Sequence, residues 1–237
     1  FSIITVVLNA KDDLISTIQS LKEQSFKDFE YIVIDGKSND GTQDVIKKNS
    51  GFITKYIIES DKGIYDAMNK GLKLAKGNYV GFLNAGDKYT PEGLNIINRH
   101  LNSNNELDFI FGTVMKKILK HGFKRNRILW NFDFYTSHSS GFFINLNSQK
   151  KLGFYNLDYK ISADYDLFYR MIIKEKMKGI ATHKDELIGI FKSGTSYSSK
   201  FTFTDHLFEE TKIRKKNGQS RIIILIIFVI HFFKNIK

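Results

Sequence analysis

The sequence contains no cysteine and a single proline, Pro91, among its 237 residues. Without cysteine the chain has no disulfide bonds and no thiolate metal ligands, so a bound metal ion must be held by oxygen or imidazole. The absence of cysteine also fits a reducing compartment such as the cytoplasm. No stretch rich in serine, glycine or proline marks a flexible linker, so we expect one compact unit rather than two loosely joined domains.

Acidic residues are in the minority, with 25 Asp and Glu against 36 Lys and Arg, and the formal net charge is +11. The basic excess is concentrated in the segments 116–127 and 212–221. Such a charge attracts anionic partners, which include a nucleotide diphosphate, a pyrophosphate-linked substrate, an anionic lipid surface and a nucleic acid. No recognition helix or RNA-binding motif accompanies the charge, so we expect no nucleic-acid partner.

The tail carries an apolar run at 222–230, extended by Phe232 and Phe233 and flanked by basic residues. This run is too short to cross a bilayer, which takes about 20 helical residues. It suits a helix in the headgroup region of an anionic membrane, and a core helix or an oligomer interface is the alternative. The chain opens directly with a strand pattern and no secretory leader, so we expect a cytoplasmic protein, peripheral on the inner face of the membrane.

Strand and helix patterns alternate in the first half of the chain and become less regular in the second. The predicted strands cover 2–8, 30–34, 54–58, 79–83, 108–111 and 141–145. The predicted helices cover 11–24, 63–76, 91–103 and 163–177, with a short one after the loop 35–42. Asn9 is expected to cap the first of them. This order indicates a doubly wound α/β fold, with a mostly parallel sheet and helices on both faces.

Polar residues follow the predicted strand ends in the first half of the chain. The residues at these positions are Leu8 and Asn9, Asp35, Asp61 and Asp87. Parallel strands share one carboxyl edge, where open α/β folds bind ligands. Three carboxylates at one edge repel one another unless a cation or a donor-rich ligand relieves them. Asp87 follows a buried strand and a small-residue turn. It is therefore predicted to be a ligand of a divalent cation that holds a nucleotide diphosphate.

The segment DKGIYDAMNKG at 61–71 predicts a helix with one apolar face, because its apolar residues recur at spacings of three and four. Its other positions are expected to line a polar cleft on the same side as Asp87. These positions are Asp61, Lys62, Asp66, Asn69 and Lys70.

Four motifs in order resemble the family 2 glycosyltransferases, which are inverting enzymes with a GT-A fold. The motifs are SIITVVLNA, YIVIDGKSNDGT, DKGIYDAMNKGLKLAKGNYVGFLNAGD and SADYDLFYRM. The resemblance covers about residues 1–190, and its third motif looks most like the bacterial O-antigen and colanic-acid biosynthesis subgroup. It implies transfer of one sugar from a UDP-sugar to a saccharide linked to undecaprenyl diphosphate, with inversion.

The same resemblance implies a domain organisation. A single GT-A domain is expected over 1–205, with a nucleotide-sugar-binding half at 1–88 tightly joined to an acceptor-binding half at 89–205. The remaining segment, 206–237, is expected to be a basic and apolar tail that associates with an anionic membrane surface.

The resemblance also implies roles for single residues. The donor is expected to contact Thr5, Val6, Leu8, Asn9, Asp35, Asp61, Lys62, Asn69, Asn84, Ala85 and Gly86. Asp87 is the expected ligand of Mn²⁺ or Mg²⁺, and Asn84 replaces the first acid of the family's metal motif. Asp164 is the expected catalytic base, with Asp166 as its rival, because inversion needs one carboxylate at the acceptor hydroxyl. His138 is expected either to touch the acceptor or a phosphate, or to be structural.

Two other functions remain open. A sugar-1-phosphate nucleotidylyltransferase would carry a glycine-rich basic loop after the first strand, where residues 9–14 read NAKDDL. The second open function is a nucleotide-binding scaffold without turnover. Asn84 favours this function because it stands where the family's metal motif has an acid. A processive membrane synthase is not expected, since the sequence has neither several membrane helices nor a Gln-X-X-Arg-Trp motif after the base.

Overall fold

The computed structural model describes residues 1–104, 106–130, 139–192 and 201–235. Within them, the larger sheet has seven strands in the order β10-β6-β9-β4-β1-β2-β3. These strands are β1 (Ser2–Val7), β2 (Glu30–Asp35), β3 (Lys55–Ile58), β4 (Tyr79–Phe82), β6 (Phe109–Phe111), β9 (Phe142–Asn145) and β10 (Gly179–Ala181). Strand β9 runs antiparallel to both of its neighbours, and the other described pairings in this sheet are parallel.

A smaller sheet of four strands lies beside the first, in the order β5-β11-β7-β8. Its strands are β5 (Lys88–Tyr89), β7 (Thr113–Met115), β8 (Leu119–Lys120) and β11 (Leu187–Ile190). Strand β5 follows β4 directly in the chain, and β11 pairs with both β5 and β7. The smaller sheet therefore extends from the carboxyl end of β4, where the site residue Asp87 is located.

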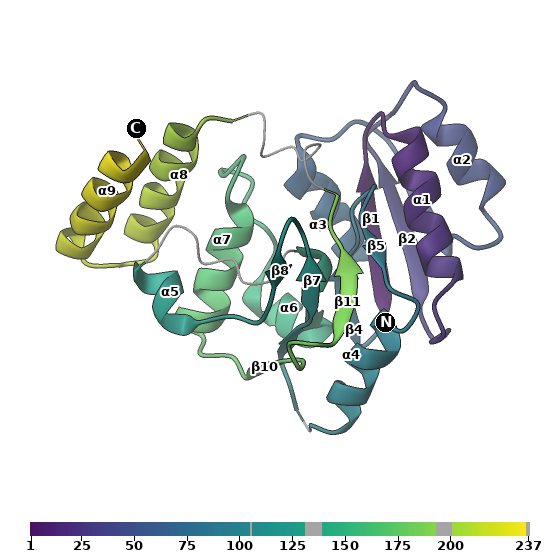
Figure 1. Ribbon diagram of the computed structural model, residues 1–237. Helices are drawn as coiled ribbons and strands as arrows, with labels where there is room; N and C mark the ends of the chain where they lie inside the picture. The colour runs from purple at the N-terminus through teal and green to yellow at the C-terminus, as the bar shows by residue number, and fades with distance from the viewer. Residues whose placement is uncertain (105, 131–138, 193–200, 236–237) are drawn as a thin grey trace.

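Helices cover both faces of the larger sheet (Figure 1). One face packs against α1 (Lys11–Lys22), α2 (Thr42–Lys48) and α4 (Gly93–Asn102). The other packs against α3 (Ile64–Leu74), α5 (Arg125–Trp130), α6 (Leu146–Leu152), α7 (Ala163–Phe168) and α8 (Phe203–Lys216). Alternation along β1 explains the two cores, because Ile3 and Val7 face the first set of helices while Ile4 and Val6 face the second. The predicted doubly wound, mostly parallel α/β architecture is confirmed.

The C-terminal helices α8 and α9 (Arg221–Asn235) lie side by side at the end of the molecule opposite α1 and α2 (Figure 1). Helix α8 is joined to the body by Arg214, which is fully buried and donates to the carbonyl oxygen of Leu129 at 2.8 Å. The Arg214 guanidinium also lies 5.0 Å from the ring centre of Tyr165 in α7. None of the helices that the structure describes has the length and apolar character needed to cross a membrane.

One local prediction was wrong, and another was correct only in part. Asn9 does not cap α1, whose N-cap is Ala10 without a side-chain hydrogen bond. Asn9 has a φ of 48°, and its side-chain oxygen instead accepts from the N–H of Asn39 at 2.9 Å. The helix predicted over 163–177 is an α-helix only to Phe168, and a π-helix follows over Tyr169–Lys174. Such wide turns often accompany functional sites, and this one follows the segment that carries Asp164.

Candidate active site

The carboxyl ends of β1, β2 and β3 form one wall of the site. These strands are parallel neighbours, so the residues that follow them leave the sheet at the same edge. The loops approach each other at Gly36, where a Cβ would lie 3.0 Å from Oδ2 of Asp61 and 3.2 Å from Cδ1 of Leu8. Leu8 is 62% exposed. An exposed apolar side chain next to a carboxylate suits a ligand that combines a flat ring with hydroxyl groups.

Asp35 stabilises the loop at the end of β2. Its buried carboxylate accepts from the N–H of Ser38 at 3.0 Å and from the Ser38 hydroxyl at 2.5 Å. The same hydroxyl oxygen accepts from the N–H of Asn9 at 2.7 Å, which ties the first loop to the second. In the structure the carboxylate lies inside the loop and supports Asn9 through Ser38, and its contact with a nucleotide stays a prediction.

Thr5 and Val6 are also inside the sheet. The Thr5 hydroxyl donates to the carbonyl oxygen of Leu83 at 2.6 Å and accepts from the Tyr31 hydroxyl at 3.0 Å. Both residues are buried because β1 is an interior strand with helices on each face. Of the first-strand residues predicted to contact the donor, the exposed ones are Leu8 and Asn9.

Acidic side chains before and within the first turn of α3 gather around Lys70, which lies further along the helix. Its ammonium lies 2.5 Å from Asp61, 2.9 Å from Glu59 and 3.6 Å from Asp66. Burial raises the pKa of Asp61, and the hydrogen bond and charge of Lys70 oppose that rise. The neighbouring Lys62 is exposed, and its N–H donates to Asp66 at 3.0 Å. Helix α3 begins only at Ile64, so Asp61 and Lys62 precede it, and of the positions predicted to line the cleft Asp66 and Lys70 lie on the helix and are partly exposed.

Asn69 differs from the prediction that it lines this cleft. It is buried, its side-chain N–H donates to the carbonyl oxygen of Tyr155, and its side-chain oxygen accepts from the N–H of Tyr155, both at 2.9 Å. Both ends of the amide are thus bound to one backbone unit, which satisfies polar groups that would otherwise be buried without partners. Asn69 holds α3 against the loop before α7.

The turn Asn84–Asp87 forms the second wall. The N–H of Asp87 donates to the carbonyl oxygen of Asn84 at 2.9 Å, and the Thr17 hydroxyl donates to the carbonyl oxygen of Asp87 at 2.9 Å. The Asp87 side chain is buried and accepts from the N–H of Lys192 at 3.0 Å. Burial raises the pKa of Asp87 to about 7, although the Lys192 N–H and the charge of Lys116 oppose the rise.

Asp13 and Lys192 adjoin this turn, and sequence reasoning missed both. Their side chains form an ion pair at 2.5 Å. A Cβ on Gly86 would lie 2.9 Å from Cδ of Lys192 and 3.3 Å from Cγ of Asp13, so a glycine lets this pair approach the turn. The charge of Asp13 acts on Asp87. The predicted acids therefore share one edge, but Asp35, Asp61 and Asp87 each have separate partners instead of meeting at one point.

One side-chain oxygen at this turn has no partner within the described part of the chain. Oδ1 of Asn84 is buried and accepts no hydrogen bond from any described residue. A buried acceptor without a donor costs free energy unless a ligand or cation satisfies it. Together with the carboxylate of Asp87, it provides oxygen atoms of the kind that hard divalent cations bind.

Asp164 lies in the first turn of α7 and is partly exposed. One of its oxygens accepts from the N–H of Tyr165 at 2.8 Å. Burial, followed by the charges of Asp164 and Tyr155, raises the pKa of Tyr65, a residue of α3. The Tyr65 hydroxyl also donates to the carbonyl oxygen of Ile161 at 2.7 Å. Asp164 is therefore next to the helix that begins beside Asp61.

Asp166 has a different environment. It is buried, and its carboxylate binds Nε of Arg170 and the side-chain N–H of Asn217, at 2.8 Å and 2.9 Å. These contacts join α7 to the end of α8. Asp166 therefore serves the packing of these helices, which leaves Asp164 as the candidate base of the pair.

A residue that the sequence did not indicate supports the loop before α7. The carboxylate of Glu209, in α8, accepts from three consecutive backbone N–H groups, those of residues 160–162, at 2.7, 2.8 and 2.6 Å. The oxygen atoms of one carboxylate thus order the backbone that leads into Asp164. His138, predicted to touch the acceptor or a phosphate, lies outside the described residues.

Comparisons with known proteins found similar sequences and similar folds. The model of the family described as "Glycosyl transferase family 2" matches residues 2–171. A PGL/p-HBAD biosynthesis glycosyltransferase of Mycobacterium tuberculosis is 30% identical over 178 residues, which are 72% of this chain and 68% of that relative. The putative teichuronic acid biosynthesis glycosyltransferase TuaG of Bacillus subtilis is 35% identical over 96 residues, 39% of this chain and 38% of the relative.

Among solved structures, residues 1–349 of S. aureus TarS in complex with UDP-GlcNAc have a similar fold. The TM-score is 0.70 at 15% sequence identity, and the match covers 99% of this chain and 73% of that one. At 15% sequence identity, this structural similarity is evidence for the fold of the chain and not for its substrate.

Proposed function

Because the chain belongs to glycosyl transferase family 2 and has its GT-A fold, we propose that it transfers one sugar from a UDP-sugar to a lipid-linked saccharide, with inversion. The observation that carries this proposal is the position of Leu8, Asp61, Asn84 and Asp87 along one sheet edge, with Asp164 next to the helix that starts there. The names of the relatives support a role in bacterial surface polysaccharide biosynthesis.

In this proposal the donor lies along the carboxyl edge. The nucleoside contacts Leu8, Asn9 and Lys62, which are exposed, and Asp61 accepts hydrogen bonds from it. The diphosphate extends to the turn Asn84–Asp87 and its residues Ala85 and Gly86. A UDP moiety is favoured because TarS, which has the same fold, binds UDP-GlcNAc.

The turn also fits a divalent cation. Oδ1 of Asn84 is buried without a partner among the described residues, and the buried carboxylate of Asp87 belongs to the same turn. We propose that Asp87 and Asn84 hold Mn²⁺ or Mg²⁺, with the diphosphate and water as further ligands. When bound, the cation would supply positive charge to the departing UDP. Lys192 and Lys116 add positive charge near Asp87.

Asp164 is the proposed base. The acceptor hydroxyl oxygen forms a bond to the anomeric carbon on the face opposite UDP, the bond from that carbon to the diphosphate oxygen breaks, and Asp164 takes the hydroxyl proton. One displacement inverts the anomeric centre, so no covalent enzyme intermediate is needed. Glu209 keeps the backbone before Asp164 in place.

A transfer assay tests the function. The protein is incubated with bacterial membranes and a panel of UDP-sugars labelled in the sugar, and label extracted into organic solvent is counted. We expect lipid-extractable label from at least one UDP-sugar. A nucleotidylyltransferase would instead convert the UDP-sugar and pyrophosphate to UTP and sugar 1-phosphate. A scaffold would bind UDP and give no product.

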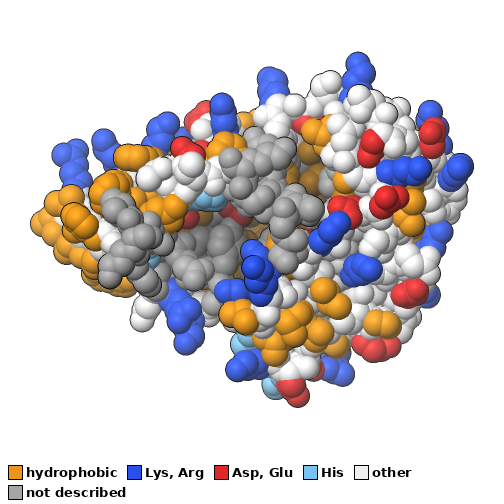
Figure 2. Space-filling view, turned by 45° about the horizontal axis from the view of Figure 1, so that its top comes forward, with side chains coloured by type: hydrophobic (Ala, Val, Ile, Leu, Met, Phe, Trp, Pro, Cys, Tyr) orange, Lys and Arg blue, Asp and Glu red, His pale blue; other side chains and the backbone are white. Residues whose placement is uncertain are grey.

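Helix α9 supports an association with the inner face of the cytoplasmic membrane. Exposed apolar side chains line it, namely Ile222, Leu225, Ile226, Val229, Ile230 and Phe233. Figure 2 shows apolar side chains gathered at the end of the molecule formed by α8 and α9, with Lys and Arg side chains around them. An apolar helix surface with basic neighbours binds anionic lipid through both features. We propose that the segment 206–237 anchors the catalytic domain, 1–205, to the membrane.

The double substitution Leu225→Glu and Phe233→Glu is expected to weaken vesicle binding by at least about 100-fold, because each inserted large apolar side chain contributes about 1.5–3 kcal/mol. The measurement is co-sedimentation with vesicles that contain phosphatidylglycerol. Ile15→Glu is the matched control, since Ile15 is an exposed apolar residue on α1. Equal binding of the double variant and the control would refute the anchor.

A further inference from the structure

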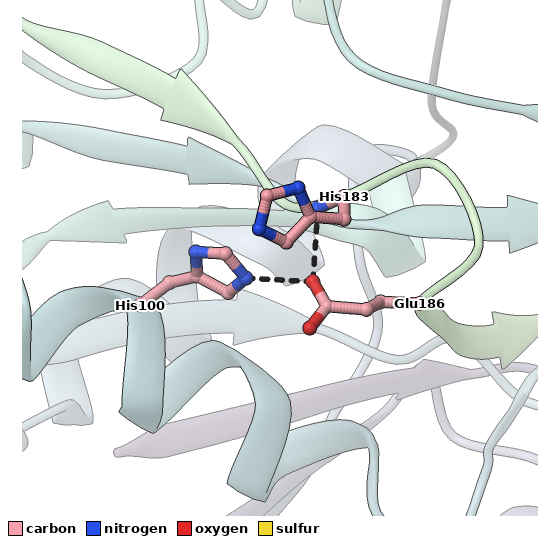
Figure 3. Close-up of side chains that lie close together, drawn as sticks. All are labelled: His100, His183 and Glu186. Carbon is pink, nitrogen blue, oxygen red and sulfur yellow. Dashed lines mark hydrogen bonds and ion pairs between the residues drawn. The ribbon is translucent and has the colours of Figure 1, made fainter.

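A second polar cluster lies apart from the candidate active site. It consists of His100 in the last turn of α4 and of His183 and Glu186 in the connection between β10 and β11 (Figure 3). Nε2 of His100 lies 2.6 Å from Oε2 of Glu186, and the rings of His100 and His183 have their centres 5.3 Å apart. Three side chains that commonly bind transition metals therefore meet where α4 adjoins the smaller sheet.

We propose that His100, His183 and Glu186 form a zinc site. One ligand atom from each residue lies within 4.8 Å of the other two. Zinc bonds of about 2.0–2.2 Å in tetrahedral geometry place ligand atoms roughly 3.3 Å apart. Small side-chain movements are enough to bring the three ligand atoms from their present separations to those of a zinc site. His183 is exposed and has room for such a movement. Two imidazoles and one carboxylate form a known zinc ligand set that leaves a fourth position for water.

Backbone hydrogen bonds hold His183 and Glu186, two of the three proposed ligands, close to each other. The N–H of Glu186 donates to the carbonyl oxygen of His183 at 3.1 Å, which closes a turn with the two residues three positions apart. The N–H of His183 donates to Oε2 of Glu186 at 2.9 Å, so the carboxylate is already turned toward the histidines. Such supporting hydrogen bonds orient metal ligands and strengthen binding.

Arg99 neutralises Glu186 in the absence of metal. Its guanidinium contacts Oε1 of Glu186, whereas His100 contacts Oε2. Arg99 is 61% exposed at its side chain, so it is able to turn into solvent when zinc supplies the positive charge. The ion pair is therefore compatible with a metal site and holds the carboxylate in position.

The proposed zinc site is distinct from the donor site. Glu186 precedes β11, and Lys192, whose N–H binds Asp87, follows the same strand. Six residues of extended chain span about 20 Å. Zinc at this place would join the end of α4 to the start of β11 and so stabilise the strand that leads to Lys192. The inference rests on the cluster alone and does not depend on the sugar-transfer proposal.

The test is a zinc titration of the metal-stripped full chain against a chromogenic chelator. We expect one zinc ion per chain, and an affinity at least about 10- to 100-fold lower in His183→Ala, since loss of even an outer-shell partner has that effect. Because His183 is exposed, its truncation leaves the packing intact, and circular dichroism checks the fold. Co²⁺ in place of zinc should give an intense visible band that His183→Ala changes.

Two controls separate this site from other metal binding. His206→Ala removes a histidine of α8 and should leave the zinc affinity unchanged, as should Asp87→Asn at the donor site. Glu186→Gln should weaken zinc binding, and UDP binding should be unaffected. Absence of stoichiometric binding at micromolar zinc, or equal affinity in wild type and His183→Ala, would overturn the proposal.

Discussion

Replacing Asp164 by asparagine is expected to lower the rate of sugar transfer by about 1,000-fold, within the range that a positioned general base contributes. Asparagine keeps the shape of the side chain and an oxygen that accepts from the Tyr165 N–H, but it cannot take a proton from the acceptor. UDP affinity should stay within about twofold, because the proposed role begins at the acceptor hydroxyl. The measurements are turnover with membranes as acceptor source and UDP binding by calorimetry.

Asp166→Asn is the matched control for this prediction. Asp166 is buried against Arg170 and Asn217, so its neutralisation should lower the melting temperature while the folded enzyme keeps its turnover. Undiminished transfer by the Asp164 variant would remove Asp164 from the mechanism. A selective loss of turnover in the Asp166 variant, with unchanged stability, would assign the base to Asp166.

Replacing Asp87 by asparagine is expected to lower UDP affinity in the presence of Mn²⁺ by about 100-fold, since the amide lacks the charge that hard cations prefer. The variant should fold at least as stably as the wild type in EDTA. Burial opposes the charge of Asp87, and asparagine preserves an acceptor for the Lys192 N–H. Titrations of UDP with Mn²⁺ and with EDTA, together with melting curves, measure both effects.

Asp13→Asn provides the comparison for the Asp87 variant. Asp13 pairs with Lys192 at the rim of the same turn, and its charge also acts on Asp87. We expect the Asp13 variant to keep a difference between UDP affinities in Mn²⁺ and in EDTA, whereas this difference should vanish in Asp87→Asn. A persistent Mn²⁺ effect after removal of the Asp87 charge would contradict its role as a metal ligand.

The strands and helices of the first half could be predicted because their patterns are local. β-Branched runs predicted β1 and β2 to within one residue at each end, and the spacing of apolar residues predicted α3. The segment 163–177 was harder to predict, since its apolar pattern does not distinguish an α-helix from an α-helix that continues as a π-helix. The prediction that Asn9 caps α1 was wrong, because its side chain contacts Asn39, thirty residues away, instead of the start of the helix.

In the candidate site, the sequence predicted the positions of residues along the chain but not the orientations of their side chains. Sequence reasoning identified which residues follow strand ends, but it could not show that Asp35 turns inward to Ser38 or that Asn69 binds the backbone of Tyr155. Lys192 and Asp13 were missed because they are 179 positions apart and meet through the smaller sheet. Only the folded chain brings such residues together.

The most direct test of the donor site is the melting temperature of the purified chain with UDP, GDP or CDP, each in Mn²⁺ and in EDTA. A ligand that binds only the folded state at about 100 times its dissociation constant stabilises it by about 2.7 kcal/mol. We predict a rise in melting temperature with UDP that depends on Mn²⁺ and exceeds the rise with GDP or CDP. An unchanged melting temperature with every nucleotide would contradict the assignment of this sheet edge as a nucleotide-sugar site.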